Sequence, residues 1–479
     1  MKAAILTLSL IFFSLLSYAQ KQGNIWYFGN HAGLDFNTTP PTFLLNGQTD
    51  FPLPNQWNEG CSSISDSSGN LLFYTNGEKI WNKLHQIMPN GNNLMGHSSS
   101  TQSSVIVHQP GSNRFFYVFT TDASENDFQN GLRYNMVDIC LDNELGDIIA
   151  SEKNIKLTDT VTEKLICIPH NNGSDYWIIT HQNNSDAFYT FRLTSSGIVD
   201  TIISHTGTFD MNGTYATGGQ MIASPNGLKI AYAKPSGIDG FTLLLDFDPS
   251  SGIVSNPQPL NTLNTEYGVS FSSDNSKLYF STVGHGEIYQ YDLNAGNLLA
   301  IIASKTHILQ NGPDGFGCLQ LAINEKIYIS RAGKEYLSVI NSPNSLGVSC
   351  DYVDSAIYLG GQYASFGLPN FIAGYKYQNQ LACTEYVPIE PPTEELIIPN
   401  IFTPNADNIN DTFIIKNLPA NSTVQIYNRW GALVSEWANP NCSWDGRTKS
   451  GAEVSAGIYY YIVSLPNNER KKGFVEVIR

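Results

Sequence analysis

Short hydrophobic runs separated by polar turns dominate the chain from residue 24 to residue 372. The runs are rich in Val, Ile, Phe, Tyr and Thr, and Gly, Asn, Asp, Ser and Pro gather between them. This is the spacing of antiparallel strands joined by tight turns, and helical periodicity is nearly absent. The pattern therefore predicts an all-β fold.

One phrase of strand, turn and strand recurs six times in this region. The first copy covers residues 63–74, and the others begin at Val105, Cys167, Met221, Val269 and Leu319. A second hairpin follows each copy, so that the period is roughly 40 to 60 residues, as in WD40-like propeller blades of four strands. Such a sheet buries both of its faces only when neighbours stack on it, which implies a ring.

The two ends of the region indicate how the ring closes. Residues 25–29 and residues 366–372 are strand-like runs that lack their own copy of the phrase. If the two ends share one blade, the ring has no open sheet edge. We therefore predict a β-propeller of seven blades over residues 20–380, with six or eight blades as alternatives.

The first nineteen residues have the architecture of a removable signal peptide. Lys2 supplies a short basic region, residues 3–16 form an apolar run, and small residues stand where a signal peptidase cleaves. The run is too short to span the roughly 30 Å hydrocarbon core of a membrane. We expect cleavage before Gln20 and no transmembrane segment in the mature chain.

Composition excludes two classes of partner. The chain has 42 acidic and 26 basic residues and a net charge of −16, which opposes binding to nucleic acid or to anionic membranes.

The seven cysteines are scattered, without the CxxC or Cys/His spacing of a zinc site. In an exported protein they predict either one or two disulfides or buried free thiols, and the pairing stays open.

Four ordered motifs mark residues 396–479, after a Pro- and Glu-rich linker at 381–395. They consist of Phe402, Thr403, Pro404, Asn405, Asp407, Asn410 and Asp411; of Tyr427, Arg429, Trp430 and Gly431; of Trp444 and Gly446; and of Gly457 and Tyr459. Together they resemble the gliding-motility-associated C-terminal domain, the type B sorting domain of the type IX secretion system. One departure is Asn408-Ile409, where that family usually has Gly and a small or β-branched residue.

This resemblance implies a small, Ig-like β-sandwich that the type IX translocon and its outer-membrane partner recognise. It also implies export through the Sec pathway and then the type IX system, to the cell surface or the medium. Residues 24–372 resemble the propeller-like modules often placed ahead of such sorting domains, through residues 24–30, 58–61, 81–82, 96–103 and 361–370. That second resemblance implies fold and export more than activity.

Several segments suggest chemistry, and each also has a structural interpretation. Residues 96–104 are dense in hydroxyls but lack the Gly-x-Ser-x-Gly elbow of a serine nucleophile, so we interpret them as bonding to strand-end backbone. The loops of a propeller converge at one mouth of the channel, where a metal or a sugar could bind. The candidates for such a cluster, which are otherwise solvated loop residues, are His170, His181, His285, Glu59, Glu163, Asp314 and Glu325.

Two features of the C-terminal segment have the same ambiguity. Residues 405–411 hold four side-chain oxygens but lack the glycine and the distant glutamate of a calcium loop, so we interpret them as consecutive turns. Trp430, Trp437 and Trp444, with residues 459–461, are expected to form the core and one face of the sandwich rather than a carbohydrate platform.

The leading functional prediction is a non-enzymatic binding protein at the cell surface or in the medium. Its ligand would be an extracellular glycan or protein, and neither a cofactor nor a catalytic residue is assigned. One alternative is an exported propeller enzyme, a glycan lyase or hydrolase, which paired carboxylates at the channel mouth would favour. Another is a structural part of a surface layer or motility apparatus, which a large exposed apolar patch would favour.

Overall fold

The computed structural model describes residues 21–50, 59–206, 217–235, 241–260, 265–313, 315–374, 383, 396–405, 410–418, 422–438, 443–465 and 470–479. The chain forms two compact units, residues 1–385 and 386–479. The predicted signal peptide lies outside the described residues, as does all of the predicted linker except Cys383. Those two boundaries stay predictions.

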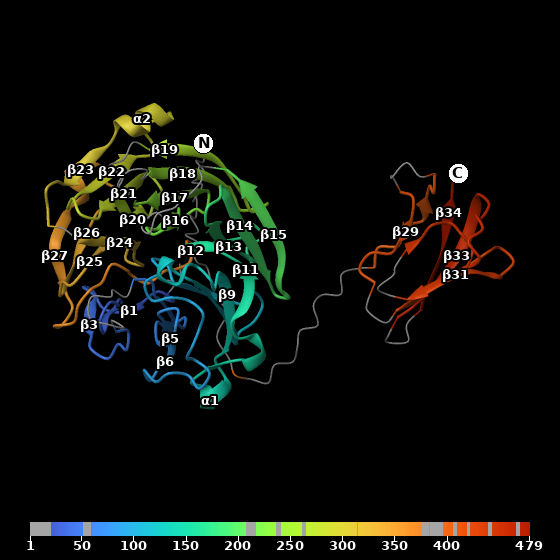
Figure 1. Ribbon diagram of the computed structural model, residues 1–479, viewed down its shortest axis with the longest axis horizontal. Helices are drawn as coiled ribbons and strands as arrows, with labels where there is room; N and C mark the ends of the chain where they lie inside the picture. The colour runs from blue at the N-terminus through green and yellow to red at the C-terminus, as the bar shows by residue number, and fades with distance from the viewer. Residues whose placement is uncertain are drawn as a thin grey trace, which may run out of the picture. The chain divides into compact units, whose positions relative to one another are not determined.

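Within the described residues, seven antiparallel sheets follow one another in chain order around the first unit (Figure 1). The first strand of each sheet contacts the first strand of the next, so these strands surround the axis as the inner strands of seven blades. Blade 1 contains β1 (Ile25–Phe28), β2 (Ala32–Asp35) and β3 (Thr42–Leu44); blade 2 contains β4 (Ser62–Ser65), β5 (Leu71–Thr75) and β6 (Ile80–Asn82); blade 3 contains β7 (Ser104–His108), β8 (Phe115–Thr121), β9 (Leu132–Asp138), β10 (Asp147–Ile148) and β11 (Ile155–Thr158).

The remaining four blades each have four strands. Blade 4 contains β12 (Val161–Pro169), β13 (Tyr176–Gln182), β14 (Ala187–Thr194) and β15 (Gly197–His205); blade 5 contains β16 (Met221–Ala223), β17 (Lys229–Lys234), β18 (Phe241–Asp248) and β19 (Ile253–Leu260); blade 6 contains β20 (Glu266–Phe271), β21 (Lys277–Thr282), β22 (Ile288–Asp292) and β23 (Thr306–Leu309); blade 7 contains β24 (Phe316–Leu321), β25 (Ile327–Arg331), β26 (Tyr336–Ile340) and β27 (Tyr352–Tyr358). The predicted seven-bladed propeller is confirmed.

The recurring phrase of the sequence is the inner hairpin of blades 2 to 7. In blade 2 it gives β4 and β5, and the turn between them is held by the Asp66 side chain. Its Oδ1 accepts the backbone N–H groups of Ser68 at 2.8 Å and Asn70 at 2.9 Å. An aspartate that bonds its own turn in this way fixes the hairpin locally, which explains why the sequence signal is clear.

Helix is scarce in the described residues. The longest helix is α2 (Leu298–Ala303) in the blade 6 connection, where the Asn297 side chain caps it by accepting the N–H of Ala300 at 3.0 Å. The other helical segments are the single turn α1 (Leu141–Glu144) and the 3-10 turns η1 (Ser124–Asn126), η2 (Ala150–Glu152) and η3 (Gly347–Cys350). None of the described helices is long and apolar enough to cross a membrane.

The ring closes differently from the prediction of a shared blade. Blade 1 is built from residues 25–44, and the end of the propeller adds only a bridge between Tyr363 and Asn30. Beyond it, residues 363–374, the return segment, run among the inner strands. Phe366 O accepts the N–H of Cys318 in blade 7 at 2.7 Å, and the N–H of Asn370 donates to Cys61 O in blade 2 at 2.9 Å.

The Asn370 side chain extends the same seam to two more blades. Its Nδ2 donates to Ser104 O in blade 3 at 3.1 Å and to Leu165 O in blade 4 at 2.8 Å. Blades 1 and 7 meet through side chains, with the Trp26 ring 5.5 Å from the Tyr328 ring. Because one segment bonds to the inner strands of several blades, the ring is held together without a shared sheet.

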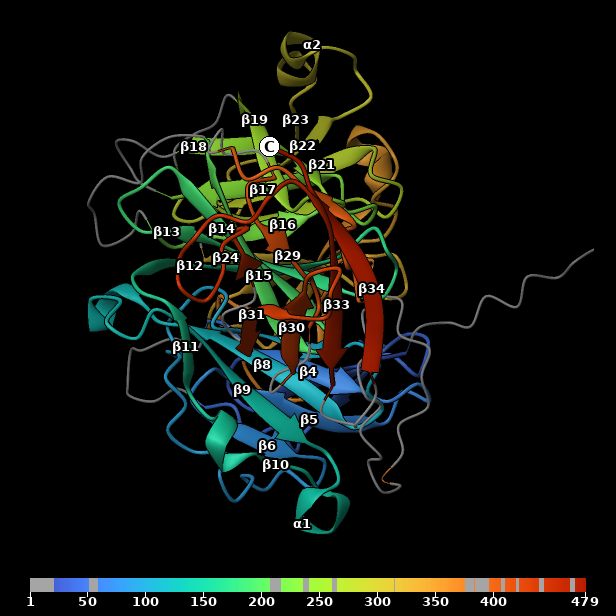
Figure 2. The ribbon, with the colours of Figure 1, turned by 90° about the vertical axis from the view of Figure 1, so that its right-hand side faces the viewer.

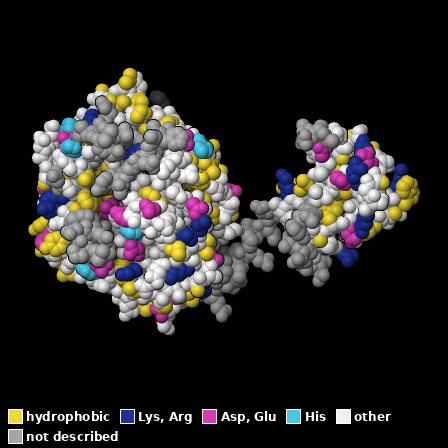
Figure 3. Space-filling model, in the orientation of Figure 1, with side chains coloured by type: hydrophobic (Ala, Val, Ile, Leu, Met, Phe, Trp, Pro, Cys, Tyr) yellow, Lys and Arg dark blue, Asp and Glu magenta, His cyan; other side chains and the backbone are white. Residues whose placement is uncertain are grey.

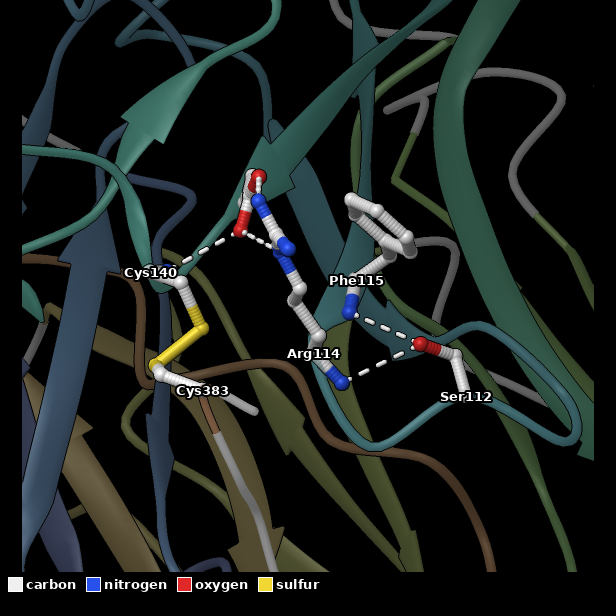
Figure 4. The surroundings of a disulfide bond; sticks show 6 residues. Ser112, Arg114, Phe115, Cys140 and Cys383 are labelled. Carbon is white, nitrogen blue, oxygen red and sulfur yellow. Dashed lines mark hydrogen bonds and ion pairs between the residues drawn. A yellow bond between two sulfur atoms is a disulfide. The ribbon is translucent and has the colours of Figure 1, made fainter. Parts of the chain in front are cut away.

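A disulfide fixes the chain beyond the return segment. Cys383 is bonded to Cys140, which follows β9 on blade 3 (Figure 4). The Cys140 N–H also donates to Asp138 Oδ1 at 3.0 Å, and Arg114 Nε donates to the same oxygen at 2.6 Å. The other cysteines of the described residues are buried free thiols, at positions 61, 167, 318 and 350, and Cys442 lies outside the described residues.

The second unit is a small β-sandwich, as predicted. One sheet has the order β28-β34-β33-β30-β31, and a two-stranded sheet pairs β29 with β32. The strands are β28 (Ile401–Phe402), β29 (Phe413–Ile414), β30 (Thr423–Tyr427), β31 (Leu433–Ala438), β32 (Ser443–Trp444), β33 (Gly457–Ser464) and β34 (Arg470–Val477). Figure 2 shows β31, β30, β33 and β34 side by side. The core includes Phe402, Phe413 and Trp444.

Candidate functional site

Two glutamates from different blades meet near the start of the inner strands. Glu59 precedes β4, Glu163 lies at the start of β12, and Thr101 precedes β7. The Thr101 hydroxyl lies 2.9 Å from Glu163 Oε2 and 3.4 Å from Glu59 Oε2. Since this hydroxyl has one hydrogen, it donates to one carboxylate at a time. Blades 2, 3 and 4 thus bring two acidic groups to one donor.

Further donors complete the cluster. The Tyr267 hydroxyl, from β20 in blade 6, donates to Glu59 Oε2. The backbone N–H of Thr101 donates to Glu163 Oε2 at 3.1 Å. Glu163 is only 5% exposed, whereas Glu59 keeps part of its side chain accessible. Solvent therefore reaches the pair mainly from the Glu59 side.

Burial and like charge set the protonation of the pair. Burial, followed by the negative charge of Glu163, raises the pKa of Glu59 to about 8, although the Tyr267 hydrogen bond opposes the shift. Burial also raises the pKa of Glu163. Two partly desolvated carboxylates that share one hydroxyl do not both ionise readily. Near neutral pH, these shifts favour the protonated form of Glu59.

Lys164 follows Glu163 in the chain but serves a different contact. Its ammonium donates to the carbonyl oxygens of Thr217 at 3.2 Å and Gly219 at 3.0 Å, and also to that of Gly218. The ammonium lies 4.6 Å from the centre of the Tyr232 ring as well. This buried cation ties the entry of blade 5 to blade 4.

The return segment lies directly behind Glu59. A Cβ atom added to Gly367 would lie 1.2 Å from the Glu59 carbonyl oxygen, so only glycine fits at this position. Glu125, which is exposed, accepts a hydrogen bond from the Ser99 hydroxyl at 2.7 Å and adds a further carboxyl group to the region. No group of three His, Cys, Asp or Glu side chains within the described ranges is arranged to hold a metal ion.

From the sequence, Glu59 and Glu163 were candidates that we otherwise expected to be solvated loop residues. That expectation is wrong for Glu163, which is buried. The three candidate histidines lie in three different surroundings. His181 is buried, 4.6 Å from the Phe188 ring, His170 stacks on Trp177, and His285 is exposed. Glu325 is exposed too, and Asp314 lies outside the described residues.

The sequence did not indicate that Thr101 and Tyr267 belong to this cluster, or that the neighbouring Lys164 binds the entry of blade 5. One hydroxyl of residues 96–104 does bond to strand-end backbone as predicted: Thr101 accepts the N–H of Gly219, just before β16, at 3.2 Å. The bridging role of Thr101 has no sequence signal. Glu163 and Lys164 do have a sequence signal, because they are two charged residues inside β12, which is otherwise apolar apart from Thr162.

The motif residues of the C-terminal unit divide into a buried and an exposed set. Phe402, Trp444 and Tyr459 pack in the core, with the Trp444 ring 5.4 Å from each of the other two. Gly446 has φ +75°, and an added Cβ there would lie 3.1 Å from Pro404. The Tyr459 hydroxyl donates to Ser455 O at 3.0 Å, and Gly457 at the start of β33 has φ +139°. These positions maintain the fold of the sandwich.

The loop after β28 forms turns through its own side chains, as predicted for the part that is described. The N–H of Asn405 donates to Asp411 Oδ1 at 3.0 Å and to Thr403 O at 2.8 Å. The N–H of Thr403 donates to the backbone oxygen of Asn410 at 2.8 Å, and Asn410 has φ +61°. Asp407 lies outside the described residues.

A rigid turn joins β30 to β31, from Tyr427 to Leu433. Asn428 Oδ1 accepts the N–H groups of Trp430 at 3.0 Å and Ala432 at 2.9 Å. Gly431 has φ +77°, which favours glycine. The expectation that Trp430 belongs to the core or a packed face is wrong: the side chain is 76% exposed, with the Arg429 guanidinium 4.5 Å above its ring.

Comparison with known protein families decides what this second unit is. Residues 396–477 match the CHU_C type IX secretion signal domain. The match covers all four motifs identified in the sequence. It supports export of the attached propeller by the type IX secretion system, with the secretion signal domain as the part that the system reads.

Solved structures with similar folds are distant. PorZ, an essential surface component of the type IX secretion system of Porphyromonas gingivalis, is 14% identical with a TM-score of 0.36, over 94% of this chain and 63% of PorZ. The hydrazine synthase of Kuenenia stuttgartiensis is 12% identical with a TM-score of 0.43, over 70% of this chain and 100% of that one. The chain thus spans less than two thirds of the PorZ chain. No curated protein matches the sequence.

Proposed function

We propose that this chain is a binding protein exported by the Sec pathway and then the type IX system, and that its propeller presents the mouth around Glu59 to an extracellular ligand. The observation that carries the proposal is the match of residues 396–477 to a type IX secretion signal domain. That domain is a separate compact unit that follows the propeller in the chain, which is the order expected of a delivery module with its cargo.

The chemistry of the mouth restricts the ligand. Glu59, which is partly accessible, and Glu125, which is exposed, offer carboxyl oxygens, and Ser99 offers a hydroxyl. Glu163 and Thr101 are buried and support Glu59 from behind. Carboxylates accept hydrogen bonds, so a ligand rich in hydroxyl or amide donors is favoured. Neutral glycans and extracellular proteins both meet this condition, whereas acidic polymers do not.

Export is tested with the full chain and a version that ends at residue 385, both produced in a host with an intact translocon. We expect the full chain in the medium or on the cell surface and the shortened chain in the periplasm. The propeller should remain folded in both, since the units are separately compact. Equal delivery of the two chains would contradict the proposal.

Binding is tested with Glu59→Gln, which keeps the size of the side chain but removes its charge and its proton. Immobilised neutral glycans and extracellular-matrix proteins serve as probes for the full chain. We expect at least a tenfold weaker binding for this variant. Glu325→Gln, at an exposed position in blade 7, is the matched control and should bind as the unmodified chain does.

A second candidate, an exported glycan hydrolase, is favoured by one specific observation: the two glutamates are bridged by a single hydroxyl. Glycosidases commonly use one carboxylic acid to protonate the leaving oxygen and one carboxylate as base or nucleophile. Release of reducing ends from a polysaccharide, lost in both Glu59→Gln and Glu163→Gln, would identify this activity. Binding without release would favour the first proposal.

A further inference from the structure

The secretion signal domain exposes a row of apolar side chains across four adjacent strands. In register, Phe474 of β34 faces Tyr460 of β33, Tyr460 faces Tyr427 of β30, and Tyr427 faces Leu433 of β31. We call these four residues the aromatic stripe. Because directly opposed residues on one sheet face lie side by side, the stripe is continuous.

The stripe lies on the outer face of the five-stranded sheet. The alternate residues, Tyr459 and Val475, are buried in the core, whereas Tyr460 and Phe474 are each 49% exposed and Leu433 is 41% exposed. Tyr427 is half-buried. A contiguous exposed apolar strip on a folded domain marks an interaction surface more often than a chance arrangement does.

The turn after β30 extends this surface. Trp430 is 76% exposed next to the Tyr427 and Leu433 end of the stripe, and Asn428 holds the turn rigid. Tryptophan, tyrosine and arginine are the residue types that most often dominate binding energy at protein interfaces. A rigid turn that presents Arg429 and Trp430 loses little conformational freedom on binding.

The described charges beside the stripe are three cations and one carboxylate, since the exposed Glu476 also lies on the sheet face of Phe474. Lys472 and Arg470 lie on the same sheet face as Phe474, because they alternate along β34, and Arg429 lies beside Trp430. Within the described part of the chain, none of these three cations has an ion-pair partner. By contrast, Arg447 and Arg479 pair with Glu453, and Lys449 pairs with Glu436.

This local charge differs from that of the protein as a whole. Residues 396–479 hold eight Lys and Arg against seven Asp and Glu, whereas the whole chain has a net charge of −16. The unpaired cations therefore favour an acidic partner surface in a protein that is otherwise acidic. Figure 3 shows basic, acidic and hydrophobic side chains close together on this unit.

From these observations we propose that the aromatic stripe, with Trp430 and the flanking Arg429, Arg470 and Lys472, is the face by which the domain docks on a protein subunit of the export machinery. The partner surface is an apolar, aromatic-accepting patch bordered by carboxylates. This inference rests on the proposed function, because it takes residues 396–479 to be read during export.

The first test follows export of the full chain with substitutions on the stripe. Tyr460→Ser combined with Phe474→Ser, and separately Arg470→Glu combined with Lys472→Glu, should lower the exported fraction at least tenfold. Ile414→Ser is the matched control: Ile414 is 45% exposed but lies on β29 in the other sheet. It should leave export unchanged.

The outcomes separate this inference from the proposed function. If export fails without residues 386–479 but is normal for both stripe variants, the docking face is wrong and the delivery role stands. If the chain without residues 386–479 is exported normally, the delivery role itself fails. Thermal unfolding of each variant shows whether a loss of export reflects a loss of fold.

A second measurement does not depend on destabilising substitutions. A photo-reactive phenylalanine analogue in place of Tyr460, in cells that export the full chain, should crosslink to an outer-membrane subunit of the translocon, identified by mass spectrometry. The adduct should disappear when Arg470→Glu and Lys472→Glu are added. Crosslinking only to lipid or to a second copy of the chain would overturn the proposal.

Discussion

Replacing Glu59 by glutamine should flatten the pH dependence of the propeller's stability between about pH 5 and pH 8. In the folded protein the pKa of Glu59 is raised from its ordinary value of 4.5 to about 8, first by burial and then by the charge of Glu163. Between those two values the folded state holds a proton that the unfolded state has released. Stability therefore falls as pH rises through this window, and it is constant with respect to this group below and above it.

The magnitude follows from proton linkage. One proton bound only by the folded state changes the free energy of unfolding by about 1.4 kcal/mol per pH unit at the limit. Because Glu59 keeps part of its side chain in solvent, we expect on the order of half of that limit or more, so about 2 to 4 kcal/mol over three pH units. The side-chain amide oxygen that the substitution introduces would keep the hydrogen bond from Tyr267, and the amide would not titrate.

The assay is urea unfolding of the full chain and the Glu59→Gln variant at pH 5.5, 7 and 8.5. The difference between the two chains isolates the propeller, since the substitution does not touch the signal domain. We expect the difference to grow in favour of the variant as pH rises. Glu325→Gln serves as the control. Parallel stability curves for the variant and the unmodified chain would refute a shared proton at this site.

Three other substitutions test the contacts described above. Lys164→Met removes the donor to three buried carbonyls and should cost about 2 to 4 kcal/mol in urea unfolding, against at most about 1 kcal/mol for Lys229→Met, whose ion pair with Asp246 is exposed. Gly367→Ala should destabilise the propeller by more than about 3 kcal/mol in the same assay, because its Cβ would overlap the Glu59 carbonyl, while Gly23→Ala, with its nearest atom 3.6 Å away, should be tolerated. Gly431→Val should cost the signal domain about 1 to 2 kcal/mol in thermal unfolding and reduce export, whereas Gly431→Asn, which tolerates positive φ, should retain both.

The sequence predicted the blades well because their signals are local. Each inner hairpin combines two apolar runs with a turn that bonds itself, as Asp66 does between β4 and β5. The sandwich was predictable for a related reason, since its motifs include the core residues Phe402 and Trp444. In both cases residues close in sequence determine the structure.

Ring closure could not be predicted in the same way. Residues 366–372 look like a strand because they are apolar, and their bonds go to partners far away in sequence. Asn370 alone joins blades 2, 3 and 4. Hydrogen bonds from one segment to several inner strands leave no repeating pattern in the sequence. The apolar composition alone therefore predicted a blade strand here.

The pairing of the two glutamates is the feature that the sequence could least predict. Glu59 and Glu163 are far apart in the chain, and a bridging threonine from a third blade sets their geometry. Their identities were noticed, but only the ring topology places them together. For Trp430 the error was the reverse: we expected burial, as is usual for tryptophan, and the side chain is exposed. The turn held by Asn428 presents it to solvent.

The disulfide between Cys140 and Cys383 has a mechanical consequence. Cys383 stands between the return segment, which ends at residue 374, and the secretion signal domain. A pull on the signal domain therefore reaches blade 3 through Cys140 before it reaches the hydrogen bonds of Asn370 in the axis. Along the covalent path, force applied to the C-terminal end therefore meets blade 3 before the hydrogen bonds that close the ring.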